Sequence, residues 1–255
     1  MSPGAAIAWF RGWGRAARLS MIVAAAALSP AFYTPRLRAT ATKQLYFTVW
    51  QVFVPFMLFT TLLSVVIIEI TIRLARDYGL GVYALELILR VLTLELLPLL
   101  TALFVALRSG SAIATEIALM RVYGDFEAMR SDGVDPLERE FLPRVLAAAM
   151  SVFMLTTVSG AVTLAAAYFS MYGLSPWGFD EFTWTIAEVF TPAQLAGITL
   201  KTIVFGVAVA VIPIAAGLSA TRDVKSAPVA VLGGMVRLFF ALGLIEVLSL
   251  AVKYV

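Results

Sequence analysis

The sequence predicts an all-α integral membrane protein with five transmembrane helices. Of its 255 residues, 61% are hydrophobic and only 14% are charged, whereas about a quarter of the residues of an ordinary soluble domain are charged. The mean hydropathy of +0.94 would oblige a soluble monomer to expose large apolar surfaces to water. Five apolar runs are long enough to cross a bilayer, which requires about 20 residues of helix.

Residues 1–44 form a basic segment that we expect to lie on the membrane rather than to cross it. They contain six basic residues and no acid. Their apolar stretch, Leu19–Leu28, is about ten residues long and therefore too short to span. Aromatic side chains among the arginines favour an interfacial amphipathic helix in the headgroup region of an anionic leaflet. A cleaved signal peptide is the alternative, because Arg15 and Arg18 precede an alanine-rich core that ends near Ser29.

Residues 45–255 are expected to form one membrane domain. The predicted spans are Leu45–Ile72, Tyr83–Leu107, Val145–Met171, Leu195–Leu218 and Val229–Val252. The second run continues in a helical pattern to about Met120, and residues 121–144 form the loop that follows it. The aromatic segment Tyr172–Thr191, between the third and fourth spans, is typical of a membrane interface.

The distribution of basic residues predicts a cytoplasmic N-terminus. The N-terminal segment, the Arg121–Arg144 loop and the Thr221–Ala227 loop together hold twelve basic residues, and the opposite side holds four. Because basic loops stay in the cytoplasm, the C-terminus is expected on the outer side. An odd number of spans agrees with this orientation.

Several ionisable residues lie inside the predicted spans. Glu95 is in the middle of the second, where a carboxylate costs about 2.5–3.5 kcal/mol even on the most lenient insertion scale. Pro98 favours a kink beside it, as is common next to polar cavities. Glu95 therefore indicates a polar-lined cavity or a buried ion pair, to which Lys201 and Glu246 are candidate contributors. Lys201 and Arg237 have a simpler alternative, since long basic side chains can extend to the nearest interface.

Small residues gather near the end of the second run. Gly110 and its neighbours between Arg108 and Glu116 would let another helix approach closely. Arg108 and Glu116 are eight residues apart and so share a helical face. We interpret this segment as a helix-packing site at the cytoplasmic membrane surface.

The loop between the second and third spans contains a second predicted helix, Asp125–Asp132. Phe126, Met129 and Arg130 would share one of its faces. An apolar face on a short cytoplasmic helix is best explained by a protein that docks there. The Asp135–Pro136 pair then starts the turn into the third span.

The residues that are absent exclude several functions. The chain has no histidine and no cysteine, which argues against a metal site, a haem or a Ser–His protease. None of the four lysines follows a glycine, so there is no phosphate-binding loop for ATP. We therefore expect no enzyme activity, no cofactor and no nucleic-acid partner. Any uphill transport would be driven by an ion gradient or by another chain.

A series of segments resembles the MlaE (YrbE-like) permease family of bacterial lipid-transporting ABC systems. The resemblance covers about Lys43 to Val255 and is strongest from Glu95 to Arg144. The matching segments are Lys43–Tyr46, Leu94–Pro98, Arg108–Val122, Glu127–Met129, Gly133–Pro136 and Leu142–Arg144.

The resemblance implies a permease subunit in the bacterial inner membrane, with a periplasmic C-terminus, acting as a homodimer. The two copies would enclose a phospholipid cavity between their first, second and fifth spans, and charged residues of that cavity map onto Glu95, Lys201 and Glu246. A separate cytoplasmic ABC ATPase would hydrolyse ATP, a periplasmic MCE-domain hexamer would cover the cavity, and a STAS-domain protein is a further implied partner. The loop helix would act as the cytoplasmic coupling helix that contacts the ATPase, through Asp125, Phe126, Glu127, Met129 and Arg130.

The chain departs from the family pattern in three places. Leu94 stands where the family often has arginine. The residues Tyr123–Asp125 replace a Thr-Glu-Gln sequence in the ATPase-contacting loop, and Ala227–Gly234 replaces a threonine-rich start of the last helix. Two rival hypotheses from the residues remain open: a secondary transporter that uses Glu95 as a proton carrier, and a membrane scaffold that transports nothing.

Overall fold

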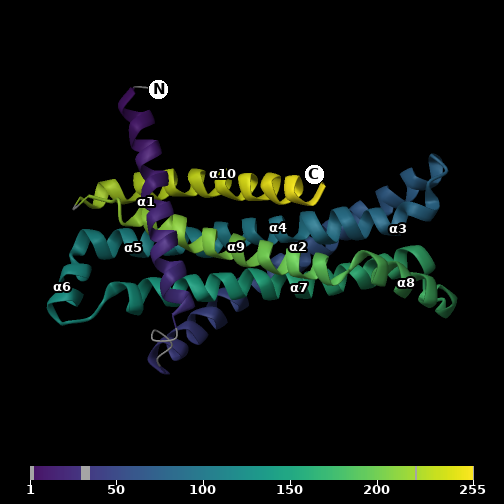
Figure 1. Cartoon of the computed structure of the whole chain (residues 1–255), viewed down its shortest axis with the longest axis horizontal. Helices are drawn as coiled ribbons and strands as arrows, with labels where there is room; N and C mark the ends of the chain where they lie inside the picture. The colour runs from purple at the N-terminus through teal and green to yellow at the C-terminus, as the bar shows by residue number, and fades with distance from the viewer. Residues whose placement is uncertain (1–2, 30–34, 222, 255) are drawn as a thin grey trace.

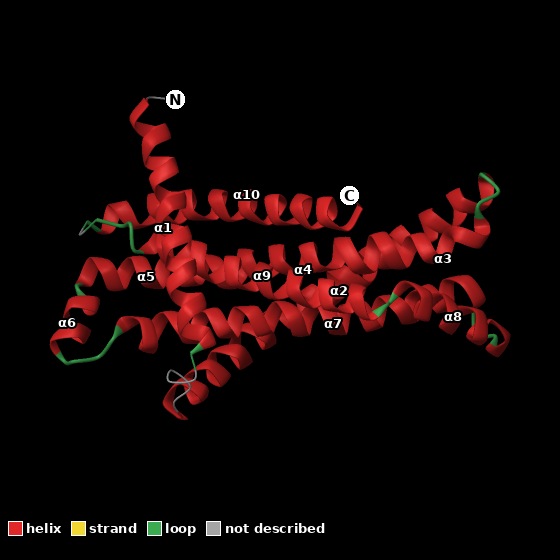
Figure 2. Cartoon of the chain, viewed as in Figure 1, coloured by secondary structure: helices red, strands yellow, loops and turns green. Residues whose placement is uncertain are grey.

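The computed structural model describes residues 3–29, 35–221 and 223–254. Within these residues the chain is helical and contains no strand (Figures 1 and 2). Five helical segments are long and apolar enough to cross a membrane. They are Leu37–Asp77, Gly81–Tyr123, Leu137–Tyr172, Pro192–Gly217 and Val224–Lys253. The predicted all-α fold with five spans is therefore confirmed.

The spans are built from the following helices, with π-helical turns named by their residues. Helix α1 covers Pro3–Leu28 and α2 covers Pro35–Asp77. The second span joins α3 (Ala84–Leu87), a π-helical turn (Ile88–Leu96), α4 (Leu97–Val105), another π-helical turn (Ala106–Gly110) and α5 (Ser111–Tyr123). Helix α6 is Asp125–Ser131, and a π-helical turn (Leu137–Phe141) leads into α7 (Leu142–Tyr172). The remaining helices are α8 (Phe179–Val189), α9 (Pro192–Gly217) and α10 (Ala227–Tyr254).

The spanning helices run along the long axis of the molecule, and α1 lies across them (Figure 1). Helix α9 is the central member, because it contacts α7, α10, α5, α4 and α1. Helix α2 packs mainly on α7 and leaves most of its surface exposed. Helices α5 and α6 lie at one end of the bundle, while α3 and α8 lie at the other (Figure 1).

Glycines allow α9 to approach its neighbours closely. A Cβ atom on Gly206 would come within 2.4 Å of the Cα of Ala149 on α7, and one on Gly217 within 2.7 Å of the carbonyl oxygen of Ala114 on α5. A Cβ on Gly110 would lie 3.3 Å from the carbonyl oxygen of Val209. Helix α9 is thus the helix that approaches the small-residue segment of the second span.

The second span is irregular next to Pro98. The Leu97 N–H donates to the carbonyl oxygen of Leu92, five residues earlier, at the end of the π-helical turn. Pro98 has no N–H to donate and disfavours a regular preceding turn. The irregularity that Pro98 predicts therefore takes the form of a π-helical turn, and this turn carries Glu95.

The predicted loop helix forms α6, but its apolar face is covered by the chain itself. Phe126 is only 2% exposed, and its ring lies 5.6 Å from that of Phe141. Met129 packs against the same cluster, whereas Arg130 is exposed. Phe126 is therefore buried while Arg130 faces outward, although both were expected on one face. Because the chain itself covers the apolar face, that face is not evidence for a docking protein.

Side-chain contacts fix both ends of this loop. The guanidinium of Arg121 donates to Glu127 at 2.6 Å. Gly124 has a φ of 82°, a left-handed conformation that glycine adopts without strain, and it joins α5 to α6. The carboxylate of Asp135 accepts from the N–H of Leu137 at 2.9 Å and so starts the next helix after Pro136.

Candidate functional site

A cavity of about 670 Å³ lies between the second, fourth and fifth spans. Its walls come from the π-helical turn of the second span, from the first half of α9 and from the last part of α10. The lining residues are Leu94, Glu95, Ala193, Gln194, Gly197, Ile198, Leu200, Lys201, Val204, Ile245, Leu248, Ser249, Val252 and Lys253. The first span contributes none of them, and the structure contains a single copy of the chain.

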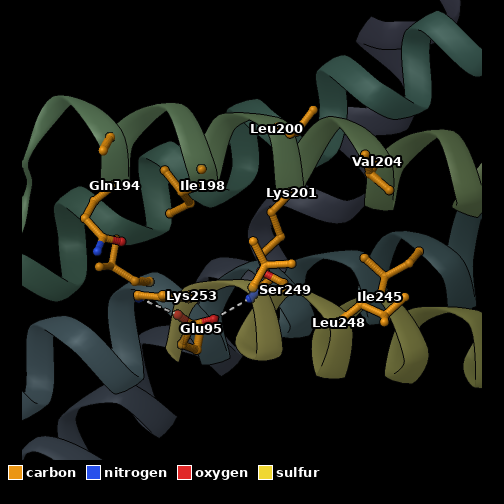
Figure 3. Close-up of a pocket in the computed structure, with 14 residues that line it drawn as sticks. Glu95, Gln194, Ile198, Leu200, Lys201, Val204, Ile245, Leu248, Ser249 and Lys253 are labelled. Carbon is orange, nitrogen blue, oxygen red and sulfur yellow. Dashed lines mark hydrogen bonds and ion pairs between the residues drawn. The ribbon is translucent and has the colours of Figure 1, made fainter. Parts of the chain in front are cut away.

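Four charged side chains form a continuous ion-pair network beside this cavity. Glu95, Lys201 and Lys253 line the cavity and are drawn in Figure 3, whereas Glu246 is not among the lining residues. The Nζ atom of Lys201 lies 2.5 Å from Oε2 of Glu95 and 2.7 Å from Oε2 of Glu246. The Nζ atom of Lys253 lies 2.6 Å from Oε1 of Glu95. Two ammonium groups and two carboxylates thus alternate, and their formal charges cancel.

Lys201 is the most deeply buried member of the network. The residue is 6% exposed, and its ammonium also lies 5.9 Å from the ring centre of Phe205. A buried charge is tolerated only when it is paired and hydrogen-bonded. In the structure the Lys201 side chain thus pairs with Glu95 and Glu246, which favours the buried ion pair over the interfacial alternative.

The helix geometry explains how these residues meet. Glu246 and Lys253 are seven residues apart on α10, so both face the same neighbours. Lys201 reaches them from α9, which packs directly on α10. Glu95 reaches them from the π-helical turn, where the altered backbone rotation aims its side chain at both lysines.

The polar and charged side chains of the cavity lining gather toward one end, and the other end is aliphatic. In Figure 3, Gln194, Lys253 and the apolar Ile198 lie to one side of Lys201, while Val204, Ile245 and Leu248 lie to the other. Such an arrangement suits an amphipathic ligand, with an anionic group near the lysine ammoniums and hydrocarbon near the aliphatic side chains.

The structure brings together the three residues that the sequence singled out, and adds Lys253. The orientation argument from the sequence placed Lys253 among the basic residues outside the membrane, because it follows the last apolar residue of the predicted fifth span. Its spacing of seven from Glu246 was the one available signal. Leu94 also lines the cavity, and Lys253 is the second cation beside Glu95.

Arg237 lies apart from this network, against helix α1. It is 9% exposed, and a Cβ on Gly12 would come within 2.7 Å of one of its guanidinium nitrogens.

Arg108 and Glu116 share a hollow at the α5 end of the bundle without pairing to each other. The hollow measures about 310 Å³, and Gln44 and Gln51 of α2 also line it. Glu116 instead accepts from Arg144 at 3.1 Å, and Arg144 also bonds to Glu140. Among the described residues no cluster of acids, histidines or cysteines suits a metal ion.

Comparison with known proteins agrees with this architecture. The family described as "Permease MlaE" matches residues 41–252. The chain is 33% identical over 166 residues to a probable ABC transporter permease protein, slr1045, of Synechocystis, a match that covers 61% of this chain and 60% of the relative. It is 31% identical to the intermembrane phospholipid transport system permease protein MlaE of Haemophilus influenzae, over 54% of this chain and 58% of that protein.

A further relative is the chloroplast protein TRIGALACTOSYLDIACYLGLYCEROL 1 of Arabidopsis thaliana, which is 29% identical over 58% of this chain and 43% of its own length. The chain thus spans only about half the length of the curated relatives it matches. The family match, by contrast, extends over nearly all of the five spans. This chain belongs to the MlaE permease family.

Proposed function

We propose that this chain is the permease subunit of an ABC-type transporter that moves phospholipid between the inner and outer membranes of a bacterium. The amphipathic cavity is the observation that carries the proposal. The ammonium groups of Lys201 and Lys253 would attract the phosphate of a headgroup, and the aliphatic wall formed by Val204, Ile245 and Leu248 would accept acyl chains. The Haemophilus relative is named as a permease of an intermembrane phospholipid transport system, which supports the same cargo.

Lipid entry would require exchange within the ion-pair network. Glu95 holds both lysines, and so a lipid phosphate must displace this carboxylate from at least one of them. Lys253 is the better candidate for exchange, because its side chain is 16% exposed whereas that of Lys201 is 4% exposed. Lys201 would keep Glu95 and Glu246 in place while Lys253 contacts the cargo.

The energy would come from a separate cytoplasmic ATPase. Helix α6 is linked through Gly124 to α5, and α5 continues without a break in the helical run to Glu95. From Tyr123 to Glu95 this run measures about 40 Å at 1.5 Å per residue. A displacement of α6 by a protein bound to its exposed side, which includes Asp125 and Arg130, would therefore be transmitted along one continuous helical run to the wall of the cavity.

The assembly would be a homodimer in the inner membrane, with the N-terminus in the cytoplasm and the C-terminus in the periplasm. A periplasmic MCE-domain hexamer would cover the cavity, and a STAS-domain protein would bind the ATPase. In this arrangement α6 lies on the ATPase side, and α8 lies on the periplasmic side at the opposite end of the bundle (Figure 1).

The test is ATP-dependent lipid transfer by the complex reconstituted from this chain and the products of its neighbouring genes. Glu95→Gln should lower the transfer rate by at least about tenfold, because a neutral amide competes less well than a carboxylate for the two lysine ammoniums, by about 1.5–3 kcal/mol for each charged hydrogen bond, and a bound lipid phosphate would be released more slowly. Glu69→Gln is the matched control, since the Glu69 side chain is 44% exposed and its carboxylate lies 3.9 Å from Arg73, away from the cavity. The assembled complex must remain intact in both variants.

Two results would contradict the proposal. Unchanged transfer in Glu95→Gln would show that the network has no part in handling cargo. Lipid transfer by this chain alone, driven by a proton gradient without ATP, would instead support the secondary transporter.

A further inference from the structure

Arg237 is a nearly buried cation without a counter-ion. It is 9% exposed, and its guanidinium lies flat against α1, where a Cβ on Gly12 would approach the Cζ atom to 2.9 Å. In the ranges that the structure describes, no hydrogen bond or ion pair involves Arg237. Its charge is therefore buried but not neutralised within the chain.

A second arginine lies close by on α1. Arg15 follows Gly12 by three residues, so it lies one helical turn from the contact with Arg237, and its side chain is exposed. Arg15 also has no hydrogen bond or ion pair within the described ranges. Two like charges that lie close together repel each other unless an anion lies between them.

The surrounding helices supply no such anion. Helices α1 and α7 contain no acidic residue, and neither does α9. The one acid of α10 is Glu246, nine residues further along and already paired with Lys201. On α5 the one acid is Glu116, which pairs with Arg144. None of the described helices around Arg237 therefore supplies a free negative charge, and we look for it in the membrane.

The position of α1 identifies the source of that charge. Helix α1 lies across the spanning helices near one end of the bundle, where it crosses α10 (Figure 1). A helix in this orientation with exposed arginines belongs at the headgroup level and not in the hydrocarbon. Leu238, beside Arg237, is at the level of Gly110, whose Cβ would lie 3.5 Å from it. Gly110 belongs to the segment expected at the cytoplasmic membrane surface.

We propose that an anionic phospholipid binds between α1 and α10, with its phosphate bridging Arg15 and Arg237. Phe240 and Leu244 follow Arg237 on the same face of α10 and are 63% and 56% exposed, so they offer an apolar path for an acyl chain toward the membrane centre. This site is separate from the cavity of Lys201 and Lys253. The bound lipid holds α1 on the bundle and is not the transported cargo.

The test compares thermal stability in detergent after removal of lipid, with phosphatidylglycerol, phosphatidylcholine or inorganic phosphate added back. Phosphatidylglycerol should raise the Tm of the unmodified chain by about 2–4 °C, the size of shift expected for one such contact in a chain of this length. Arg237→Gln and Arg15→Gln should lose this gain in Tm.

Without lipid, Arg237→Gln should have a Tm no lower than that of the unmodified chain, because the substitution removes the repulsion between the two arginines. A purely structural role for Arg237 would predict a lower Tm instead.

Two control variants locate the site. Arg73→Gln changes an arginine whose side chain is 80% exposed, far along α2, and should keep the full gain. Lys253→Gln weakens lipid binding at the cavity and should keep the part of the gain that depends on Arg237. Native mass spectrometry should find one phosphatidylglycerol fewer on Arg237→Gln than on Arg73→Gln. The proposal is overturned if Arg237→Gln gains as much as the unmodified chain, if Lys253→Gln alone abolishes the gain, or if inorganic phosphate reproduces it.

Discussion

Lys201 is the residue on which the other charges of the cavity depend. Its ammonium lies within 2.8 Å of a carboxylate oxygen from both Glu95 and Glu246, and its side chain is 4% exposed. Of these two glutamates, Lys253 contacts Glu95 and not Glu246, and its side chain is 16% exposed. Removal of one lysine is therefore not equivalent to removal of the other.

Lys201→Met should destabilise the protein far more than Lys253→Met. The first change leaves Glu246 buried without a cation, an uncompensated charge of the kind that costs about 3–5 kcal/mol. The second leaves Glu95 paired with Lys201, and the partly exposed side chain of Lys253 suggests a loss of about 1 kcal/mol or less. Thermal unfolding of the purified variants in one detergent measures both effects.

The double variant Lys201→Met/Glu246→Leu should recover much of the stability lost in Lys201→Met. It removes one positive and one negative charge together, and the Glu95–Lys253 pair remains. Replacing both members of a buried pair is often close to neutral, whereas breaking it is costly. A double variant no more stable than Lys201→Met would show that the network is not coupled as its geometry implies.

The charged residues of the network could be predicted from the free-energy cost of an ionised group inside a membrane span, but the contacts between them could not. Glu95, Lys201 and Glu246 stood out because ionised groups inside a span are expensive. Nothing in the sequence says which lysine meets which glutamate, since the pairs join residues 106 and 45 positions apart. Lys253 was not recognised because it lies at the end of its span, where a lysine is ordinary.

At the scale of elements, α9 owes its central place to small residues on the faces it shares with α7 and α5. Gly206 on α9 faces Ala148 and Ala149 of α7 so closely that backbone atoms of the two helices would meet any added carbon. Without a hydrophobic driving force in lipid, such close contact is the main source of helix association.

Gly206→Ala should therefore weaken the packing of α9 on α7. A Cβ atom would lie 2.4 Å from the Cα of Ala149 and 2.8 Å from the carbonyl oxygen of Ala148, and backbone atoms cannot rotate away as a flexible side chain can. Overpacking of this kind costs about 1–3 kcal/mol. Thermal unfolding in detergent should show a lower Tm, and protease sensitivity should rise.

Gly197→Ala is the matched control on the same helix. Nothing lies within 4 Å of the position of its Cβ. Alanine in place of glycine inside a helix stabilises by about 0.5–1 kcal/mol, so the Tm should stay unchanged or rise. Equal losses in the two variants would mean that helix propensity or the detergent, and not contact with α7, controls the stability of α9.

The elements were predictable in number and type but not in arrangement. Apolar length fixed five spans, and Pro98 indicated an irregular second span. The face of α6 was misjudged, because the sequence cannot show that Phe141, fifteen residues on, returns to cover Phe126. In a membrane nearly every face of a span is apolar, so periodicity does not reveal that α9 is central or that α1 lies across the bundle.

At the scale of the whole molecule, burial is uneven among the spans. Within the most apolar stretch of each span, 61% of the residues are buried in the second and only 22% and 28% in the first and fifth. The first and fifth spans therefore present most of the surface that must face lipid or another chain. This pattern agrees with the first and fifth spans at the interface of the proposed homodimer, whereas the second span, the most buried of the five, has less surface free for a partner copy.

The placement of α6 and α8 at opposite ends of the bundle makes the topology testable (Figure 1). The chain contains no cysteine, so single cysteines can be introduced without removing native ones. Ala128 on α6 and Ala187 on α8 are both exposed alanines on short helices, and replacement by cysteine should disturb neither helix. If the five spans cross the membrane, these two positions must lie on opposite sides of it.

The excess of basic residues on the α6 side sets the expected direction of labelling. Twelve basic residues belong to the N-terminal segment and the two loops on that side, against four on the other, so α6 should be cytoplasmic. A membrane-impermeant maleimide should label Ala187→Cys in intact spheroplasts, and Ala128→Cys only after the membrane is permeabilised. Labelling of Ala128→Cys alone in intact spheroplasts would show the opposite orientation, with α6 out of reach of any cytoplasmic ATPase. Equal labelling of both before permeabilisation would contradict the five-span topology itself, because an odd number of crossings must separate these helices.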